Sequence, residues 1–399
     1  MGDREAAIVK VIDSLGSVDP AGWDACANPQ GEPYNPFVSH AFLHALEESG
    51  SATQRTGWLG QHLLVEDDEG RLAACMPLYL KNHSRGEYVF DHGWANAFEN
   101  AGGRYYPKLQ ASIPFTPATG PRLLVPAGPG RDDAEDMLIA GAVELGKRLG
   151  VSSIHIAFMQ ERQWKRAGQL GFLQRTDQQF HWFNRGYGTF ADFLADLSSR
   201  KRKMIRKERE KALENDIEIE CVTGGGITED HWDAFYAFYM DTGSRKWGAP
   251  YLTREFFSLI GERMAQDVLL VMAKRNGRLI AGALNFIGGD ALYGRNWGAI
   301  EHHPFLHFEC CYYRAIDFAI ERGLARVEAG AQGEHKLARG YVPTRTHSSH
   351  WIANASFRDA VAEYLTRERQ YVDRDIAALG EYVPFRHDMA KPEHQEDDF

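Results

Sequence analysis

Residues 269–286 read LLVMAKRNGRLIAGALNF, two apolar runs on either side of a charged centre that contains glycine. This pattern predicts a strand, a turn and a second strand. Residues 63–80, LLVEDDEGRLAACMPLYL, have the same plan, with LLV first, then GRL, then a second apolar run. The recurrence of one hairpin pattern in both halves of the chain is the first sign of an internal repeat.

Further matching segments flank the two hairpins in the same order. They are WDA at 23–25 and 232–234, hydroxyl-capped helix starts at Ser39 and Thr253, strands ending in a Gly/Trp turn at 88–95 and 292–299, helices at 132–149 and 308–322, and strands at 153–158 and 325–329. The order helix, helix, strand, strand, strand, helix, strand therefore occurs twice. We expect two homologous α/β domains, each a mixed sheet flanked by helices.

Length and composition agree with two domains in an ordinary cytoplasmic protein. A chain of 399 residues exceeds what one core usually supports. We place the domains at 1–186 and 187–386, followed by a polar tail at 387–399. The formal charge of −10 argues against a chain built wholly to coat nucleic acid. The five cysteines show no metal or redox spacing, and we expect neither a signal peptide nor a membrane helix.

One polar stretch distinguishes the second repeat from the first. Residues 327–343 read VEAGAQGEHKLARGYVP, whereas the equivalent stretch 159–172, MQERQWKRAGQLGF, is typical of an amphipathic helix. The polar stretch follows directly after a predicted strand, where open α/β sheets place their sites. We therefore expect the second domain to carry the active site and the first to support it.

Four strings carry a resemblance to a known family. They are HWDAFYAFY at 231–239, RKWGAPYL at 245–252, LHFECCYY at 306–313 and EAGAQGEHKLARGY at 328–341. Together with the repeated element order, they resemble the FemAB-like family of bacterial N-acyltransferases within the GNAT acyltransferase superfamily, from about residue 20 to about residue 385. The resemblance implies two tandem GNAT-like domains and the transfer of an acyl or aminoacyl group to an amine.

Amide formation gives the polar stretch its expected roles. The amine needs a base, for which Glu328, Glu334 and His335 are candidates, and the leaving group needs an acid, for which Tyr341 or Tyr313 is a candidate. Further expected roles are oxyanion stabilisation by Gln332 and the amides of Gly330 and Gly333, and binding of a phosphate or an acceptor carboxylate by Lys336 and Arg339. The alternative is a polar loop in which Glu328 pairs with Lys336 or Arg339.

The resemblance also implies a donor site before the helix at 308–322. GNAT folds hold the donor's phosphates in a loop spelled Q/R-x-x-G-x-G/A, and RNWGAI at 295–300 keeps the Arg and the first Gly but ends in Ile. We expect Arg295, Asn296, Trp297 and Gly298 to bind the donor. The alternative is a tight turn with a surface Arg. His307 and Glu309 are expected to line the groove, and no metal is expected because His303 and His307 lack a further ligand at matching spacing.

Two more segments are candidates for binding. The turn-rich stretch 241–251 resembles an acceptor-binding loop through Asp241, Arg245, Trp247 and Tyr251, or else simply joins two helices. The predicted helix that begins at Thr189 with an Asp192 capping box continues into Arg200 to Lys211, where eight of twelve residues are basic. A basic stripe attracts the phosphates of coenzyme A and of tRNA alike, although a solvated helix is the simpler interpretation.

The sequence therefore supports a leading hypothesis and two alternatives. The leading hypothesis is an N-acyltransferase without a tightly bound cofactor, which uses acyl-CoA and an amine acceptor in direct attack. The first alternative takes an aminoacyl-tRNA as donor, bound through Arg200 to Lys211. The second is a module that binds a ligand without catalysis.

Overall fold

The computed structural model describes residues 8–246, 250–330 and 333–386, except the side chains of Lys246 and Glu334. Its strands are β1 (Val9–Ile12), β2 (Leu59–Gly60), β3 (His62–Glu66), β4 (Leu72–Met76), β5 (Tyr79–Lys81), β6 (Lys108–Ala111), β7 (Ser153–Met159), β8 (Leu173–Phe183), β9 (Ile217–Thr223), β10 (Val268–Arg275), β11 (Arg278–Ile287), β12 (Ala291–Ala299), β13 (Arg326–Glu328) and β14 (Val342–Ile352).

The α-helices are α1 (Pro20–Ala27), α2 (His40–Glu48), α3 (His92–Asn100), α4 (Arg131–Leu149), α5 (Glu161–Gln169), α6 (Phe190–Asp196), α7 (Ser199–Ala212), α8 (Glu229–Lys246), α9 (Arg254–Arg263), α10 (Leu306–Phe308), α11 (Arg314–Glu321) and α12 (Ala355–Gly380). A π-helical turn, η6 (Glu309–Tyr313), joins α10 to α11. The 3₁₀ turns are η1 (Leu15–Ser17), η2 (Pro36–Val38), η3 (Gln54–Thr56), η4 (Gly224–Gly226), η5 (Ala265–Asp267) and η7 (Glu334–Arg339).

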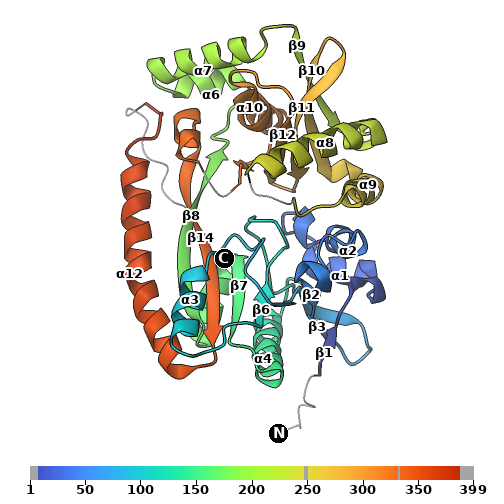
Figure 1. Cartoon of the computed structure of the whole chain (residues 1–399), viewed down its shortest axis with the longest axis vertical. Helices are drawn as coiled ribbons and strands as arrows, with labels where there is room; N and C mark the ends of the chain where they lie inside the picture. Colours follow the sequence, from blue (N-terminus) through green and yellow to red (C-terminus); the bar gives the residue numbers. More distant parts are fainter. Residues whose placement is uncertain (1–7, 247–249, 331–332, 387–399) are drawn as a thin grey trace.

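One large mixed sheet runs through the molecule (Figure 1). In the described residues it has 11 strands in the order β2-β5-β6-β7-β14-β8-β13-β12-β11-β10-β9, and β1, β3 and β4 form a separate small sheet. The pairs β6–β7 and β12–β13 are parallel, and the other named pairs of the large sheet are antiparallel. Each half of the chain thus contributes one parallel pair.

The last strands of the two halves are interleaved in the middle of this sheet. β14, from the end of the chain, lies between β7 and β8, with His350 opposite His155 on one side and Thr346 opposite Asp177 on the other. β8, in turn, separates β14 from β13. Because backbone hydrogen bonds cross from one half to the other on both sides of β14, the sheet continues without an edge between the halves.

The apolar cores follow from the alternation of side chains across this sheet. The residues of β10 to β12 that face α8 and α9 join a core shared with α1 and α2, in which Phe42 packs edge-on against Phe256 and Phe286 at 5.7 and 5.3 Å. The residues on the opposite face pack against α6, α10 and α11. Each such aromatic pair adds about 0.5–1.5 kcal/mol to the area it buries. The first core therefore joins the two halves.

Most predicted elements are present, and the predicted fold class is confirmed. Ser39 and Thr253 cap α2 and α9 as expected, accepting from the backbone N–H of Phe42 and Phe256. The basic segment is a helix, α7, and the chain ends in the long helix α12. None of the helices in the described part of the chain combines the length and the apolar composition that a membrane crossing needs.

The strand expected at 88–95 is wrong. The chain forms no strand there, and Gly93 and Trp94 lie inside α3. Its presumed counterpart, 292–299, is strand throughout, and no turn interrupts it. In α3 Trp94 is buried and Gly93 is exposed, whereas in β12 Gly298 is buried and Trp297 is half-buried, so the shared Gly and Trp do not mark equivalent positions. The two domain boundaries remain a prediction; the large sheet takes strands from both sides of the first boundary, between residues 186 and 187.

Candidate active site

The parallel strands β12 and β13 part after a short common run. They pair through Ala291–Arg326, Leu292–Val327 and Tyr293–Glu328, after which β13 ends while β12 continues along β11 to Ala299. From Gly294 onward, the edge of β12 that faced β13 has no strand partner among the described residues. We call this place the opening. At Ala299 the N–H donates to the hydroxyl of Thr242 and the carbonyl accepts from Arg245, so the backbone groups that can serve a ligand are those between Gly294 and Gly298.

Aromatic and imidazole side chains gather at the opening on the face of the sheet covered by α10 and η6. His307 packs edge-on against Trp297 at 5.3 Å and against Tyr312 at 5.4 Å. His335, from η7, lies 5.7 Å from the ring of Phe308. The π-helical turn positions Tyr312 here, and such turns are frequent at functional sites.

His335 and Tyr312 form a hydrogen-bonded pair at this face. The Tyr312 hydroxyl lies 2.9 Å from Nε2 of His335, whose side chain is exposed. Partial burial and the charges of Arg339 and Lys336 lower the pKa of His335, while burial raises the pKa of Tyr312. At neutral pH the pair is therefore a neutral imidazole, which can accept a proton, beside a protonated phenol, which can donate one.

Lys336 and Arg339 hold η7 in place. Lys336 is buried and donates to the carbonyl of Gly330 at 2.9 Å, and burial lowers its pKa to about 8. Arg339 donates to both carboxylate oxygens of Glu208, from α7, at 2.9 Å and lies over the ring of Phe308. Both cations are thus committed to the loop, in place of the phosphate or carboxylate they were expected to bind.

Glu328 lies on the opposite face and is paired there. Arg326 donates to its Oε1 at 3.0 Å, and Nε2 of His181, from β8, is 3.8 Å from its Oε2. Burial lowers the pKa of His181. The expected pairing of Glu328 with Lys336 or Arg339 is wrong, since the partner is Arg326. Glu328 is 3% exposed, so its predicted role as a base has no direct route to solvent.

The donor loop expected at 295–300 is wrong, because 295–299 belong to β12. Gly298 lets α8 pack closely against β12, because a Cβ at this position would lie 2.3 Å from the backbone carbonyl carbon of Phe238 in α8. Arg295 points to the other half of the chain and donates to the carbonyl of Phe115. Trp297 reaches the opening, as described above, and Asn296 lines a pocket on the other face.

Three more expected residues are structural. Glu309 is fully buried and pairs with Arg209 and Arg314, so it does not line a groove. Tyr341 is fully buried beneath Tyr312, at 5.5 Å between ring centroids, and cannot meet a leaving group from the opening without rearrangement. Tyr313, named as its alternative, donates to Glu208 inside the core.

The acceptor segment is helical for half of its length. Asp241 and Arg245 lie in the last turns of α8 and pair with each other, and Arg245 also donates to the carbonyl of Ala299 at 2.9 Å. Tyr251 stacks on Phe115 of the first half at 4.7 Å between ring centroids, and its role as a wall of an acceptor site stays a prediction. Trp247, Gln332 and the side chain of Glu334 lie outside the described residues.

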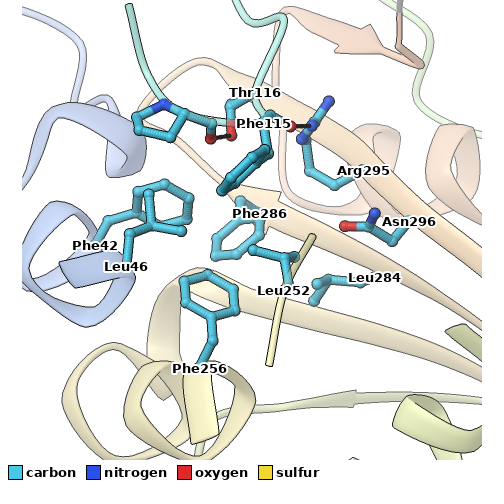
Figure 2. Close-up of a pocket in the computed structure, with 11 residues that line it drawn as sticks. Phe42, Leu46, Phe115, Thr116, Leu252, Phe256, Leu284, Phe286, Arg295 and Asn296 are labelled. Atoms are coloured by element: carbon cyan, nitrogen blue, oxygen red, sulfur yellow. Dashed lines mark hydrogen bonds between the residues drawn. The ribbon is translucent and has the colours of Figure 1, made fainter. Parts of the chain in front are cut away.

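A small apolar pocket lies at the junction of the two halves, on the face of the sheet opposite His335 (Figure 2). Its free volume of about 10 Å³ is that of a single water molecule. The lining comprises Phe42, Leu46, Pro114, Phe115, Thr116, Leu252, Phe256, Leu284, Phe286, Arg295 and Asn296. Figure 2 shows the aromatic rings at one end of this pocket and Arg295 and Asn296 at the other.

Sequence reasoning missed Tyr312 and His181. A regular helix through 306–321 gives no preference for Tyr312 over Tyr313, and the π-helical turn that decides between them leaves no mark in the sequence. His181 had a readable signal: polar Gln179 and His181 alternate with apolar Phe180 and Trp182, which places both polar residues on one face of a strand.

A family model described as FemAB-like, peptidoglycan biosynthesis/recognition, matches residues 14–387. No curated protein is similar enough in sequence to count as a relative.

Solved structures resemble the chain over most of its length. FemX has a TM-score of 0.54 at 13% identity, over 86% of this chain and 98% of that one. The C-terminal domain of a putative lysylphosphatidylglycerol synthetase from Agrobacterium fabrum has a TM-score of 0.50 at 10% identity, over 81% and 96%. A tandem GNAT protein from the clavulanic acid biosynthesis pathway has a TM-score of 0.45 at 13% identity, over 87% and 99%. At these identities the likeness to the first two concerns the fold alone.

Proposed function

Because the chain belongs to the FemAB-like family, whose model matches residues 14–387, we propose that it is an N-acyltransferase that forms an amide at the opening between β12 and β13. The observation that carries the proposal is the hydrogen-bonded pair of His335 and Tyr312 beside the unpaired edge of β12. A proton acceptor, a proton donor and free backbone groups are what direct acyl transfer to an amine requires.

The roles follow from protonation states. The acceptor reacts as its free amine, whose lone pair forms the C–N bond, and neutral His335 takes the one proton that the amine nitrogen loses as the amide forms. The tetrahedral oxyanion is stabilised by the unpaired N–H groups along β12. As the bond to the leaving group breaks, Tyr312 gives that group its proton and recovers one from His335 across the 2.9 Å hydrogen bond. No covalent enzyme intermediate is needed.

The donor that the surface supports best is an aminoacyl-tRNA. Helix α7 contacts α10, η6 and η7, which carry the aromatic face of the opening. Arg200, Lys203, Arg206 and Lys207 project from it into solvent. They form no ion pair with a described residue, whereas Arg209 on the same helix pairs with Glu309 and Asp317. Free cations beside a reaction site suit a donor with a long row of phosphates.

Acyl-CoA is the second candidate, and the edge of β12 favours it. A donor with amide groups along its chain can pair with the N–H and C=O groups of β12 between Gly294 and Gly298, as an additional strand would. The Arg295–Gly298 segment does not support this donor, because it is a strand and not a phosphate-binding loop.

The test supplies the purified protein with a tRNA pool charged with labelled amino acids, or with labelled acetyl-CoA, and with a mixture of amine acceptors. Aminoacyl esters and thioesters are cleaved by mild alkali and amides survive, so alkali-stable label reports transfer. We expect stable label from charged tRNA, declining steeply as salt is raised. Label from acetyl-CoA alone would select the second donor. A lack of stable label from both donors would reject the proposed function.

A further inference from the structure

Arg295 is a charged side chain that the protein itself does not neutralise. Its Nη2 donates to the carbonyl of Phe115, and the Tyr88 hydroxyl also contacts it. No described carboxylate lies within 4.0 Å of its nitrogens. The carboxylate of Glu328 acts on it from farther away and is already paired with Arg326. A half-buried guanidinium without a counter-ion is costly unless something else supplies one.

Arg122 shows how this chain satisfies a structural arginine. Its Nε, Nη1 and Nη2 donate to the carbonyls of Ala157, Pro121 and Ala118 at 2.9, 2.9 and 2.7 Å, and it is 1% exposed. All three of its nitrogens are engaged and sealed from solvent. Arg295 differs because it remains partly exposed and lines the pocket at the junction of the halves. Its remaining N–H groups are therefore available for a ligand.

The surroundings of Arg295 are held in unfavourable backbone conformations. Tyr88 and Phe115, which both contact it, have φ of 59°, a region that bulky residues rarely adopt. The segment that carries Tyr88 is anchored on both sides, because Glu87 and Asp91 accept from the buried Lys108 at 2.6 and 2.5 Å. Strain that the surrounding structure maintains is characteristic of binding sites.

We propose that Arg295 binds the carboxylate of a small amino acid at the junction of the two halves. This site goes beyond the proposed function, because it lies on the face of the sheet opposite His335. The guanidinium of Arg295 points to Phe115 of the first half and lines the apolar pocket there. The apolar pocket, with free space for about one water molecule, takes a side chain of methyl size.

The test is calorimetric titration of the full chain, without any donor, using L-alanine and L-alaninamide, and glycine and glycinamide. In each pair the amide replaces the charged carboxylate by a neutral carboxamide of similar size. We expect the wild type to bind each amino acid at least about tenfold more tightly than its amide, as a charge-assisted bidentate contact implies. Arg295→Gln should abolish this preference, and Arg295→Lys should retain part of it.

Arg275→Gln is the matched control, because Arg275 pairs with Glu301 away from the pocket and its loss should leave the preference unchanged. Thermal melting of Arg295→Gln checks that the variant folds. Equal binding of amino acid and amide by the wild type, absence of binding by both, or an unchanged preference in Arg295→Gln would each overturn the proposal. Since no donor is present, these results are independent of whether transfer itself is observed.

Discussion

At the scale of single residues, the site depends on a few protonation states and one close packing contact. His335 is neutral because two nearby cations and partial burial oppose its protonation. Tyr312 stays protonated because burial raises its pKa. Gly298 is required because α8 crosses β12 at that point. The first two features bear on the proposed acyl transfer, and the third on stability.

The pH dependence of transfer should report His335. A base works only when unprotonated, and its pKa is lowered, so we expect activity to persist as the pH falls through 6.5, the ordinary value for imidazole, and to decline only below it. The measurement is kcat/KM of the wild type between pH 5 and 8. An acid limb centred at or above 6.5, or the same limb in His335→Gln, would contradict the assignment.

Gly298→Ala should destabilise the protein without altering any charge. The added Cβ meets the backbone of Phe238 rather than a flexible side chain, and overpacking of this kind costs about 1–3 kcal/mol. Urea denaturation measures the free energy of unfolding. Gly225→Ala is the control, because nothing lies within 4 Å of its Cβ position and its φ is not positive. If Gly298→Ala proved as stable as this control, the packing role would be wrong.

Features that depend on local sequence pattern could be predicted from the sequence. Features that depend on which distant elements pack against each other could not. Hairpins, caps and helix periods were readable, as Ser39, Thr253 and the stretch 269–286 show. Residues Arg295 to Gly298 were misread, because a strand glycine demanded by a crossing helix looks like a loop glycine when α8 is not in view. His335 could be named as a candidate because polar groups on small-residue backbone are conspicuous, whereas the position of its partner Tyr312 depends on a π-helical turn.

At the scale of elements, α7 has two different faces. One face ties the helix to the site: Arg209 pairs with Glu309 and Asp317, and Glu208 accepts from Arg339 in η7. The other face presents free cations to solvent. The eight basic residues noted in the sequence therefore do not act alike, and only the solvent-facing ones suit a phosphate-rich donor.

Two sets of variants should separate these faces. Arg206→Gln with Lys207→Gln should leave the free energy of unfolding unchanged, weaken binding of charged tRNA and reduce the slope of its salt dependence by roughly one unit for each phosphate that is no longer bound. Arg209→Gln should lower the free energy of unfolding by about 2 kcal/mol, because it removes charged hydrogen bonds to the buried Glu309. Filter binding and urea denaturation are the measurements. Unchanged tRNA affinity in the double variant would exclude α7 as the donor surface.

At the scale of the whole molecule, the two halves form a single sheet and share a core. β14 lies between β7 and β8, and Phe37 and Phe42 of the first half pack against Phe286 of the second. The pocket at Arg295 also takes its lining from both halves. The first half therefore contributes lining to this pocket as well as strands to the shared sheet.

This interleaving predicts cooperative unfolding. We expect far-UV circular dichroism and tryptophan fluorescence to show one coincident urea transition, because neither half keeps its sheet without the other. Fragments 1–186 and 187–399, produced separately, should lack cooperative transitions, since β7 loses β14 and β13 loses β8. A fragment that melts cooperatively on its own would show that the halves are independent folding units.

The most direct test of the central claim compares the wild type with His335→Gln in a single-turnover transfer assay with the donor that the wild type accepts. The variant retains the size and polarity of the side chain but cannot act as the base. His231→Gln, on α8 and outside the opening, is the control. The account predicts that alkali-stable product forms at least about 100-fold more slowly in His335→Gln while the control equals the wild type. Equal rates in all three proteins would contradict acyl transfer at this opening.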